Sequence, residues 1–206
     1  MEAAAPTDLP TDLCSIAATG LACVRGDRML FAGLSLDVTA GGALHLTGPN
    51  GSGKSSLMRI LAGLLRPFAG TVTGKGSIAL LDERPALDAH LPLGRALQFW
   101  ARCDGVPASR LDEVAQATAI TGLLDVPVRF LSTGQRKRAA LARTIAGQAP
   151  VWLLDEPLNG LDNASVAMVE ALAARHCASG GICIAASHQP IALPGGRVLN
   201  VADFAA

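Results

Sequence analysis

Runs of apolar residues along the chain predict strands that alternate with helices. Polar and apolar residues alternate over 34–38, as in a strand with one buried face, and residues 43–47 form a second strand after a Gly-Gly turn. Residues 151–154 are apolar throughout, which is typical of a strand buried on both faces. The remaining predicted strands span 77–81, 182–186 and 197–201.

Helical periodicity is clearest after the second strand. Apolar residues recur on one helical face from Leu57 to Leu65, in a helix that we expect to begin near Lys54 and to end before Pro67. Further helices are predicted over 93–103, 109–120, 132–146 and 163–178, the second of them opened by a capping pattern at Ser109 and Asp112. The alternation predicts an α/β fold with a largely parallel core sheet, in which residues 84–130 form a helical arm without strands.

Composition narrows the class of protein. The chain has 206 residues, 50% of them hydrophobic, so it can bury a core and fits one domain. The 17 basic and 17 acidic residues give no net charge, which argues against nucleic acid as a partner. Only three residues are lysines, namely Lys54, Lys75 and Lys137.

The sequence gives no sign of a membrane span or a signal peptide. The longest charge-free stretch near the C-terminus, residues 177–196, is interrupted by glycines and prolines. Residues 1–12 are acidic and broken by proline, and we expect them to form a loose tail. Five cysteines without a C-x-x-C pair are interpreted as small buried residues in a reducing compartment.

The segment 48–56, GPNGSGKSS, contains the P-loop pattern G-x-x-x-x-G-K-S between a predicted strand and a predicted helix. Its glycines allow backbone N–H groups to surround phosphate oxygens at the positive end of the helix. Lys54 would reach the β- and γ-phosphates, and the Ser55 hydroxyl would bind Mg²⁺. The alternative is a glycine-rich turn that caps a helix and binds nothing, but such a turn needs no lysine. The predicted nucleotide-binding residues of the loop are Gly48, Pro49, Asn50, Gly51, Ser52, Gly53, Lys54, Ser55 and Ser56.

Two carboxylates follow the apolar strand at 151–154. A P-loop needs a carboxylate at the end of a buried strand to organise Mg²⁺, and Asp155 meets this requirement. Glu156 fits the general base that polarises the attacking water. Taken alone, the pair could be two solvated acids in an ordinary turn before Pro157; the P-loop upstream favours the catalytic interpretation.

The segment Leu131-Ser-Thr-Gly-Gln135 precedes the helix at 132–146 and identifies a family. The run from 131 to 162, LSTGQRKRAALARTIAGQAPVWLLDEPLNGLD, resembles the signature, Walker B and D-loop of ABC-type ATPases, and the resemblance covers nearly the whole chain. It implies a single P-loop NTPase domain of the ABC-ATPase type over 1–206. That fold has a mostly parallel core sheet, an N-terminal antiparallel β part and a helical arm near 84–130.

The resemblance also implies a mechanism. In this family two subunits meet head to tail, and each ATP lies between the Walker A of one subunit and the signature of the other. Four residues would then bind the partner's ATP: Ser132, Thr133, Gly134 and Gln135. Ser132 with Gln135 is also a capping-box pattern, and both roles can hold at once. His188 resembles the family's switch histidine, which contacts the γ-phosphate or the attacking water. Lys54, Glu156 and His188 are therefore the predicted catalytic residues.

Three positions depart from the family pattern. Arg25 stands where an aromatic residue usually stacks on adenine, and a guanidinium plane can take that role. Glu83 aligns with the glutamine of the Q-loop, where its carboxylate could face Mg²⁺. Thr133 replaces the commoner signature glycine. The predicted metal ligands are Ser55, Asp155 and Glu83, and the predicted cofactors are ATP and Mg²⁺.

Residues 21–31, together with the P-loop and residues 57–65, resemble the ATP-binding subunits of bacterial cytochrome c maturation systems, also called haem exporter subunits. This resemblance implies integral membrane partner subunits, a homodimer of ATPase subunits, an indirect link to haem-delivery proteins and a peripheral position on the cytoplasmic face of the inner membrane. The alternatives are an ABC exporter ATPase for another substrate and a non-transport ABC ATPase.

The helical arm is where the resemblance places the contact with the membrane subunits. Leu91, Leu93, Leu97 and Trp100 would give the arm an apolar surface. Alternatively, these side chains pack inside the arm.

Overall fold

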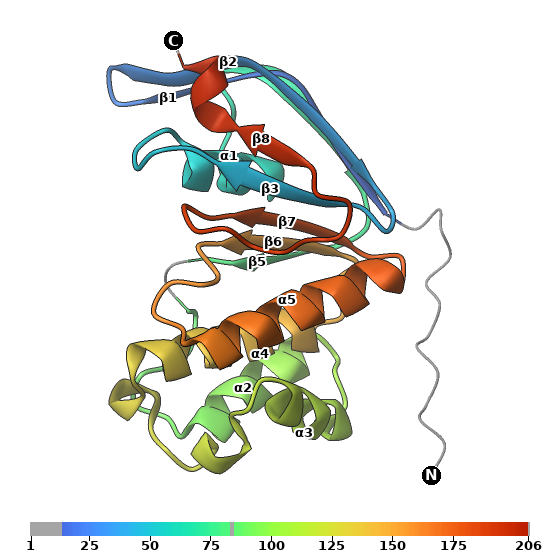
Figure 1. Cartoon of the computed structure of the whole chain (residues 1–206). Helices are drawn as coiled ribbons and strands as arrows, with labels where there is room; N and C mark the ends of the chain where they lie inside the picture. Colours follow the sequence, from blue (N-terminus) through green and yellow to red (C-terminus); the bar gives the residue numbers. More distant parts are fainter. Residues whose placement is uncertain (1–13, 83–84, 206) are drawn as a thin grey trace.

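Two sheets form the body of the protein in a computed structural model that describes residues 14–82 and 85–205 (Figure 1). The smaller sheet is antiparallel, in the order β2-β1-β4. The larger sheet is parallel, in the order β5-β6-β7-β3-β8. The strands are β1 (Ser15–Arg25), β2 (Arg28–Thr39), β3 (Ala43–Thr47), β4 (Ala69–Lys75), β5 (Ile78–Leu81), β6 (Val151–Asp155), β7 (Ile182–Ala186) and β8 (Val198–Asn200).

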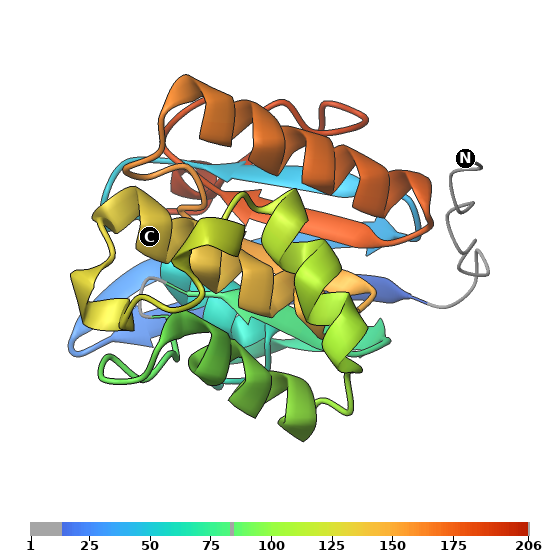
Figure 2. The same ribbon diagram turned by 90° about the horizontal axis from the view of Figure 1, so that it is seen from below.

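Helices cover both faces of the parallel sheet. Helix α1 (Lys54–Leu61) lies between the two sheets, and α4 (Thr133–Ala146) and α5 (Asn163–Ala178) lie on the opposite face. Helices α2 (Leu93–Cys103) and α3 (Ala108–Ala117) pack against α4, and the view from below shows all four covering this face (Figure 2). Short 3₁₀ segments occupy Thr121–Leu123, Val128–Phe130 and Val201–Phe204.

Burial follows the polarity pattern of each strand. Every residue of β6 and β7 is buried, because helices pack on both faces of the parallel sheet. Strand β2 alternates exposed and buried residues over its second half, as expected for a sheet with one wet face. Both the parallel core sheet and the N-terminal antiparallel part are confirmed. The described residues of the arm, 85–130, contain helices and no strand beyond an isolated bridge between Pro92 and Pro127.

Three details of the predicted elements are wrong or missing. Helix α1 ends at Leu61, earlier than predicted, because Gly63 has a φ of 73° and Leu64 N–H donates to the Arg59 carbonyl at 2.8 Å. This left-handed turn closes the helix before Pro67 and leaves Leu64 69% exposed. Helix α3 begins at Ala108 with Pro107 at its N-cap and no side-chain cap, so the pattern predicted at Ser109 is not used.

The third difference concerns β1 and β4, which the polarity pattern did not reveal. Strand β4 has the sequence AGTVTGK and is almost entirely exposed. It has few of the large apolar residues that mark a strand in a sequence. The predicted tail, residues 1–12, lies outside the described residues. Across the part of the chain that is described, no helix is long and apolar enough to span a membrane.

Candidate functional site

The loop between β3 and α1 contains three glycines with positive φ angles. Gly48, Gly51 and Gly53 have φ values of 137°, 80° and 102°, a region that L side chains adopt at a cost. A Cβ at Gly53, the N-cap of α1, would lie 2.9 Å from the Phe31 ring. The glycine pattern is therefore a steric requirement of a loop that turns its backbone tightly into the helix.

Lys54 is the first residue of α1 and is only 6% exposed. Its Nζ donates to the carbonyl oxygens of Gly48 at 2.8 Å and Pro49 at 3.3 Å. These contacts hold the ammonium group across the mouth of the loop, beside the N–H groups at the helix start. This is the place where a phosphate chain would find both a charge and backbone donors.

Asp155 ends β6, next to the loop, and is 4% exposed. Burial raises the pKa of its carboxyl, while a hydrogen bond with Ser55 opposes this rise. Its Oδ1 is buried and has no hydrogen-bond partner in the described part of the chain. A buried carboxylate oxygen that lacks a donor, beside a serine hydroxyl, fits the oxygen ligands that Mg²⁺ requires.

Glu156 follows Asp155 in a strained conformation, with a φ of 46°. Its N–H donates to the Ala186 carbonyl at the end of β7 at 2.8 Å, which fixes the backbone. The Glu156 Oε2 lies 2.9 Å from Nδ1 of His188, with Glu156 20% and His188 48% exposed. A carboxylate held by an imidazole at an open edge can accept a proton from water.

These groups line one cleft of about 720 Å³. The predicted site residues that line it are Asn50, Gly51, Gly53, Lys54, Ser55, Ser56, Thr133, Asp155, Glu156 and His188. Sequence reasoning missed four further lining residues: Arg28, Leu30, Lys137 and Asn159. Three predicted loop residues, Gly48, Pro49 and Ser52, are absent from the lining; Gly48 and Pro49 act through the carbonyls that hold Lys54.

Arg25, the predicted adenine-stacking residue, does not line this cleft. It ends β1, and its cross-strand partner Arg28 lines the cleft instead. The only signal in the sequence is the tight Gly26-Asp27 turn, which brings both arginines to one end of the hairpin. Glu83, the predicted third metal ligand, lies outside the described residues.

The signature residues stand at the start of α4. Ser132 caps the helix: its Oγ accepts from Gln135 N–H at 3.3 Å, and Gln135 Oε1 accepts from Ser132 N–H at 2.9 Å. The predicted capping box is thus confirmed. A Cβ at Gly134 would lie 2.8 Å from the Gly160 carbonyl, so the glycine allows the loop after β6 to pack on the helix start. Thr133, by contrast, faces the cleft of its own chain.

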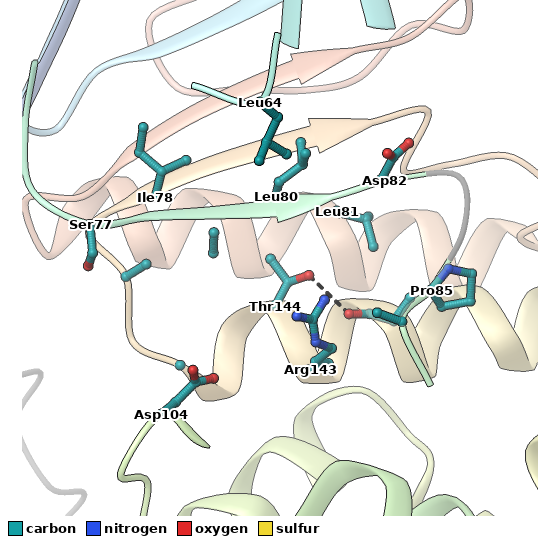
Figure 3. A pocket seen from close by; sticks show the side chains of 15 residues that line it. Leu64, Ser77, Ile78, Leu80, Leu81, Asp82, Pro85, Asp104, Arg143 and Thr144 are labelled. Carbon is teal, nitrogen blue, oxygen red and sulfur yellow. Dashed lines mark hydrogen bonds between the residues drawn. The ribbon is translucent and has the colours of Figure 1, made fainter. Parts of the chain in front are cut away.

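A second hollow, of about 620 Å³, lies between β5 and α4 (Figure 3). Arg143 and Thr144 extend into it from α4. The Arg143 guanidinium lies 3.8 Å from the centre of the Trp100 ring, and burial lowers the pKa of Arg143 while the Asp104 carboxylate opposes this. Its Nε is buried and finds no hydrogen-bond acceptor among the described residues.

The four apolar side chains predicted to face a partner divide into two groups. Leu93 and Leu97 are 0% and 3% exposed, so they pack inside the arm and the prediction of surface exposure is wrong for them. Leu91 is 39% exposed, and Trp100 is half-buried beneath Arg143. The apolar face of α2 that carries Leu93 and Leu97 is therefore packed inside the arm, where α2 contacts α3 and α4.

A family model described as "ABC transporter" matches residues 31–159. The chain belongs to the ABC transporter family. Among curated relatives, "Cytochrome c biogenesis ATP-binding export protein CcmA" of Novosphingobium aromaticivorans is 60% identical over 93% of this chain and 97% of its own length. The protein of the same name in Sphingopyxis alaskensis is 55% identical over 87% of this chain and 92% of its own length. The chain thus belongs to the cytochrome c biogenesis ATP-binding export proteins within the ABC family.

A solved structure supports the fold assignment. A metal-chelate type ABC transporter in an inward-facing conformation matches 91% of this chain and 80% of its own, with a TM-score of 0.75 and 25% identity. Family membership makes the chain an ATP-binding subunit that hydrolyses ATP coupled to transport. It also implies dimerisation and membrane transporter partners, with which the chain associates at the membrane surface.

Proposed function

We propose that the chain is the ATPase subunit of a bacterial inner-membrane complex that exports or delivers haem for cytochrome c maturation. The observation that carries the ATPase function is the convergence of Lys54, Asp155, Glu156 and His188 on one cleft. The link to cytochrome c rests on the curated relatives, whose name is cytochrome c biogenesis ATP-binding export protein. The protein would act from the cytoplasmic face of the membrane.

Phosphate binding depends on the loop and the start of α1. N–H groups at the helix start and the Lys54 ammonium surround the β- and γ-phosphates. Lys54 exchanges its contacts with the Gly48 and Pro49 carbonyls for contacts with phosphate oxygens. Since these carbonyls already hold the ammonium in the mouth of the loop, binding requires little rearrangement of the side chain.

Glu156 is the general base. Its carboxylate accepts a proton from the water that attacks the γ-phosphate, and His188 orients that carboxylate through the contact at 2.9 Å. His188 is nearly half exposed, so it can also contact the γ-phosphate once ATP is bound.

Asp155 and Ser55 would hold Mg²⁺. The unpartnered Oδ1 of Asp155 and the adjacent Ser55 hydroxyl are the oxygen donors that support this assignment. Mg²⁺ held by these two residues would supply positive charge that neutralises the phosphate oxygens. Glu83 remains a predicted additional ligand.

A second copy of the chain completes each site. Ser132 is exposed at the N-terminus of α4, where its hydroxyl and the adjacent N–H groups can meet the γ-phosphate of the partner subunit's ATP. In the capping box the Ser132 Oγ accepts a hydrogen bond from Gln135 N–H, so the same hydroxyl can still donate its hydrogen to a phosphate oxygen. Head-to-tail pairing of two copies therefore places one signature over each P-loop.

The hollow between β5 and α4 is the surface on which we expect a cytoplasmic segment of the membrane subunits to dock. It combines exposed apolar residues, Leu64 and Ile78, with the half-buried side chain of Arg143, whose Nε is buried. Asp82 lines it and accepts hydrogen bonds from Arg59 of α1 at 3.0 to 3.3 Å. Because α1 begins at Lys54, this ion pair connects the docking hollow to the phosphate loop.

Two variants test the proposed function in the assembled membrane complex. Lys54→Ala should abolish ATP hydrolysis and deplete mature c-type cytochromes in cells, whereas Lys75→Ala, on the exposed strand β4, should do neither. Hydrolysis at the normal rate by Lys54→Ala would refute the assignment of the site. Normal cytochrome c levels in cells whose complex lacks ATPase activity would refute the haem role alone.

A further inference from the structure

The first turns of α4 face two ways. Thr133 and Lys137, one helical turn apart, both line the nucleotide cleft of their own chain. Ser132 is exposed at the helix start and bonded to Gln135, outside that lining. A helix whose start is assigned to the partner subunit's ATP thus also presents a half-buried lysine to its own cleft.

The charged residues that line the cleft indicate a role for Lys137. Only three lysines occur in the sequence, and two of them, Lys54 and Lys137, line the same cleft although they come from α1 and α4. Asp155 and Glu156 supply carboxylates to the same space. A triphosphate adds several negative charges, and catalysis of phosphoryl transfer depends mainly on groups that neutralise them. Lys137 adds a positive charge to those of Lys54 and Arg28 in the lining of the cleft, and it comes from α4 rather than from the P-loop.

We propose that Lys137 binds the phosphate chain of the ATP that its own P-loop holds. Helix α4 then serves two nucleotides, its own through Lys137 and that of the partner subunit through Ser132. Because α2 and α3 pack on α4, nucleotide bound in the cleft also fixes the position of the helical arm. This inference rests on the proposed ATPase function and adds to it a phosphate-binding residue outside the Walker motifs.

The test is equilibrium binding of a fluorescent ATP analogue to the full chain and its variants. Lys137→Gln should raise the Kd about five- to tenfold, because one charged contact with phosphate is lost. Lys137→Arg should keep the Kd within about twofold of the wild-type value, since it retains the charge. Lys75→Gln is the matched control for loss of a lysine elsewhere, and its Kd should stay unchanged.

Two further measurements separate phosphate binding from a structural effect. The weakening caused by Lys137→Gln should be seen with ATP and be absent with AMP, which lacks the β- and γ-phosphates. The Kd of Lys137→Gln should also depend less steeply on salt concentration than the wild-type Kd.

Equal Kd values for Lys137→Gln and Lys75→Gln, or equal weakening with ATP and AMP, would overturn the proposal. Failure of Lys137→Arg to restore ATP binding would also overturn it, because the charge would not be what matters. Lys54→Ala keeps the two proposals apart: if it binds ATP normally, the proposed ATPase site itself is wrong. If only the Lys137 variants bind normally, the ATPase assignment stands without this residue.

Discussion

The Nδ1 atom of His188 and the Oε2 atom of Glu156 lie 2.9 Å apart, although 32 positions separate the residues in sequence. Strands β6 and β7 pair in parallel, with Asp155 opposite Ala186, so the residues that follow each strand meet at the same edge of the sheet. The register of two neighbouring strands thus positions the proposed general base and its partner beside the phosphate loop.

We expect Glu156→Gln to lower kcat for ATP hydrolysis by at least about 100-fold while ATP binding stays close to normal. The amide keeps the shape of the side chain and cannot accept the proton from water.

His188→Ala should lower kcat about 10- to 100-fold with a smaller change in KM, because the base remains but is no longer oriented. Steady-state kinetics of the complex would check both; a Glu156→Gln variant with near-normal kcat would exclude Glu156 as the base.

Gly53→Ala should destabilise the chain and abolish ATP binding. The new Cβ would lie 2.9 Å from the Phe31 ring at a φ of 102°, so the loop must shift. We expect a loss of about 1–3 kcal/mol in the free energy of unfolding. Gly195→Ala is the control, since Gly195 has a φ of 80° but nothing within 4 Å of the added Cβ. Both variants place alanine at a positive φ, so any greater loss of stability or ATP binding in Gly53→Ala is due to the clash with Phe31. Denaturant unfolding and ATP-binding assays would measure this difference.

The strands and helices whose ends are marked by nearby residues in the sequence were predictable. Strands β3 and β7 and helix α5 agree with the predicted boundaries, because their apolar runs are flanked by glycine, asparagine or aspartate. The P-loop was predictable because its glycines mark backbone turns with positive φ angles, which the local sequence pattern already indicates.

Residues that reach the site through tertiary packing were not predictable. Arg28 lines the cleft in place of Arg25, its partner in the hairpin, and Lys137 lines it one helical turn after Thr133 on α4. The Gly26-Asp27 turn indicates that the two arginines are neighbours but not which of them faces the cleft, and no local pattern marks Lys137 as a cleft residue. The exposed strand β4 was missed because its pairing with β1, and not its own polarity pattern, defines it.

Asp155→Asn should stabilise the chain at pH 7 when Mg²⁺ is absent. Burial raises the pKa of Asp155 above the ordinary value of 3.8, so the ionised carboxylate costs folding free energy at every pH above the raised pKa. We expect a gain of about 1–2 kcal/mol, at the expense of ATP hydrolysis. The gain should shrink as the pH falls through the raised pKa, since the native carboxyl then becomes protonated.

Thermal unfolding with and without Mg²⁺ checks this expectation. Added Mg²⁺ and ATP should stabilise the wild-type chain more than the Asp155→Asn variant, because the cation binds only the folded wild-type site tightly. A variant less stable than the wild type at pH 7 without Mg²⁺ would mean that burial of the charge is not the dominant effect at this residue.

Ser132 has two roles that two substitutions can separate. Ser132→Ala removes the cap, so it should lower the free energy of unfolding by about 1 kcal/mol and reduce hydrolysis by the assembled complex. Ser132→Asp keeps a good N-cap, because a carboxylate oxygen can accept from Gln135 N–H as the serine oxygen does, and should leave stability near the wild-type value. Its negative charge would nevertheless repel the γ-phosphate of the partner subunit's ATP, so hydrolysis should fall more than about tenfold. Denaturant unfolding of the chain, paired with ATPase assays of the complex, would distinguish these outcomes. Normal hydrolysis by Ser132→Asp would restrict Ser132 to capping its own helix.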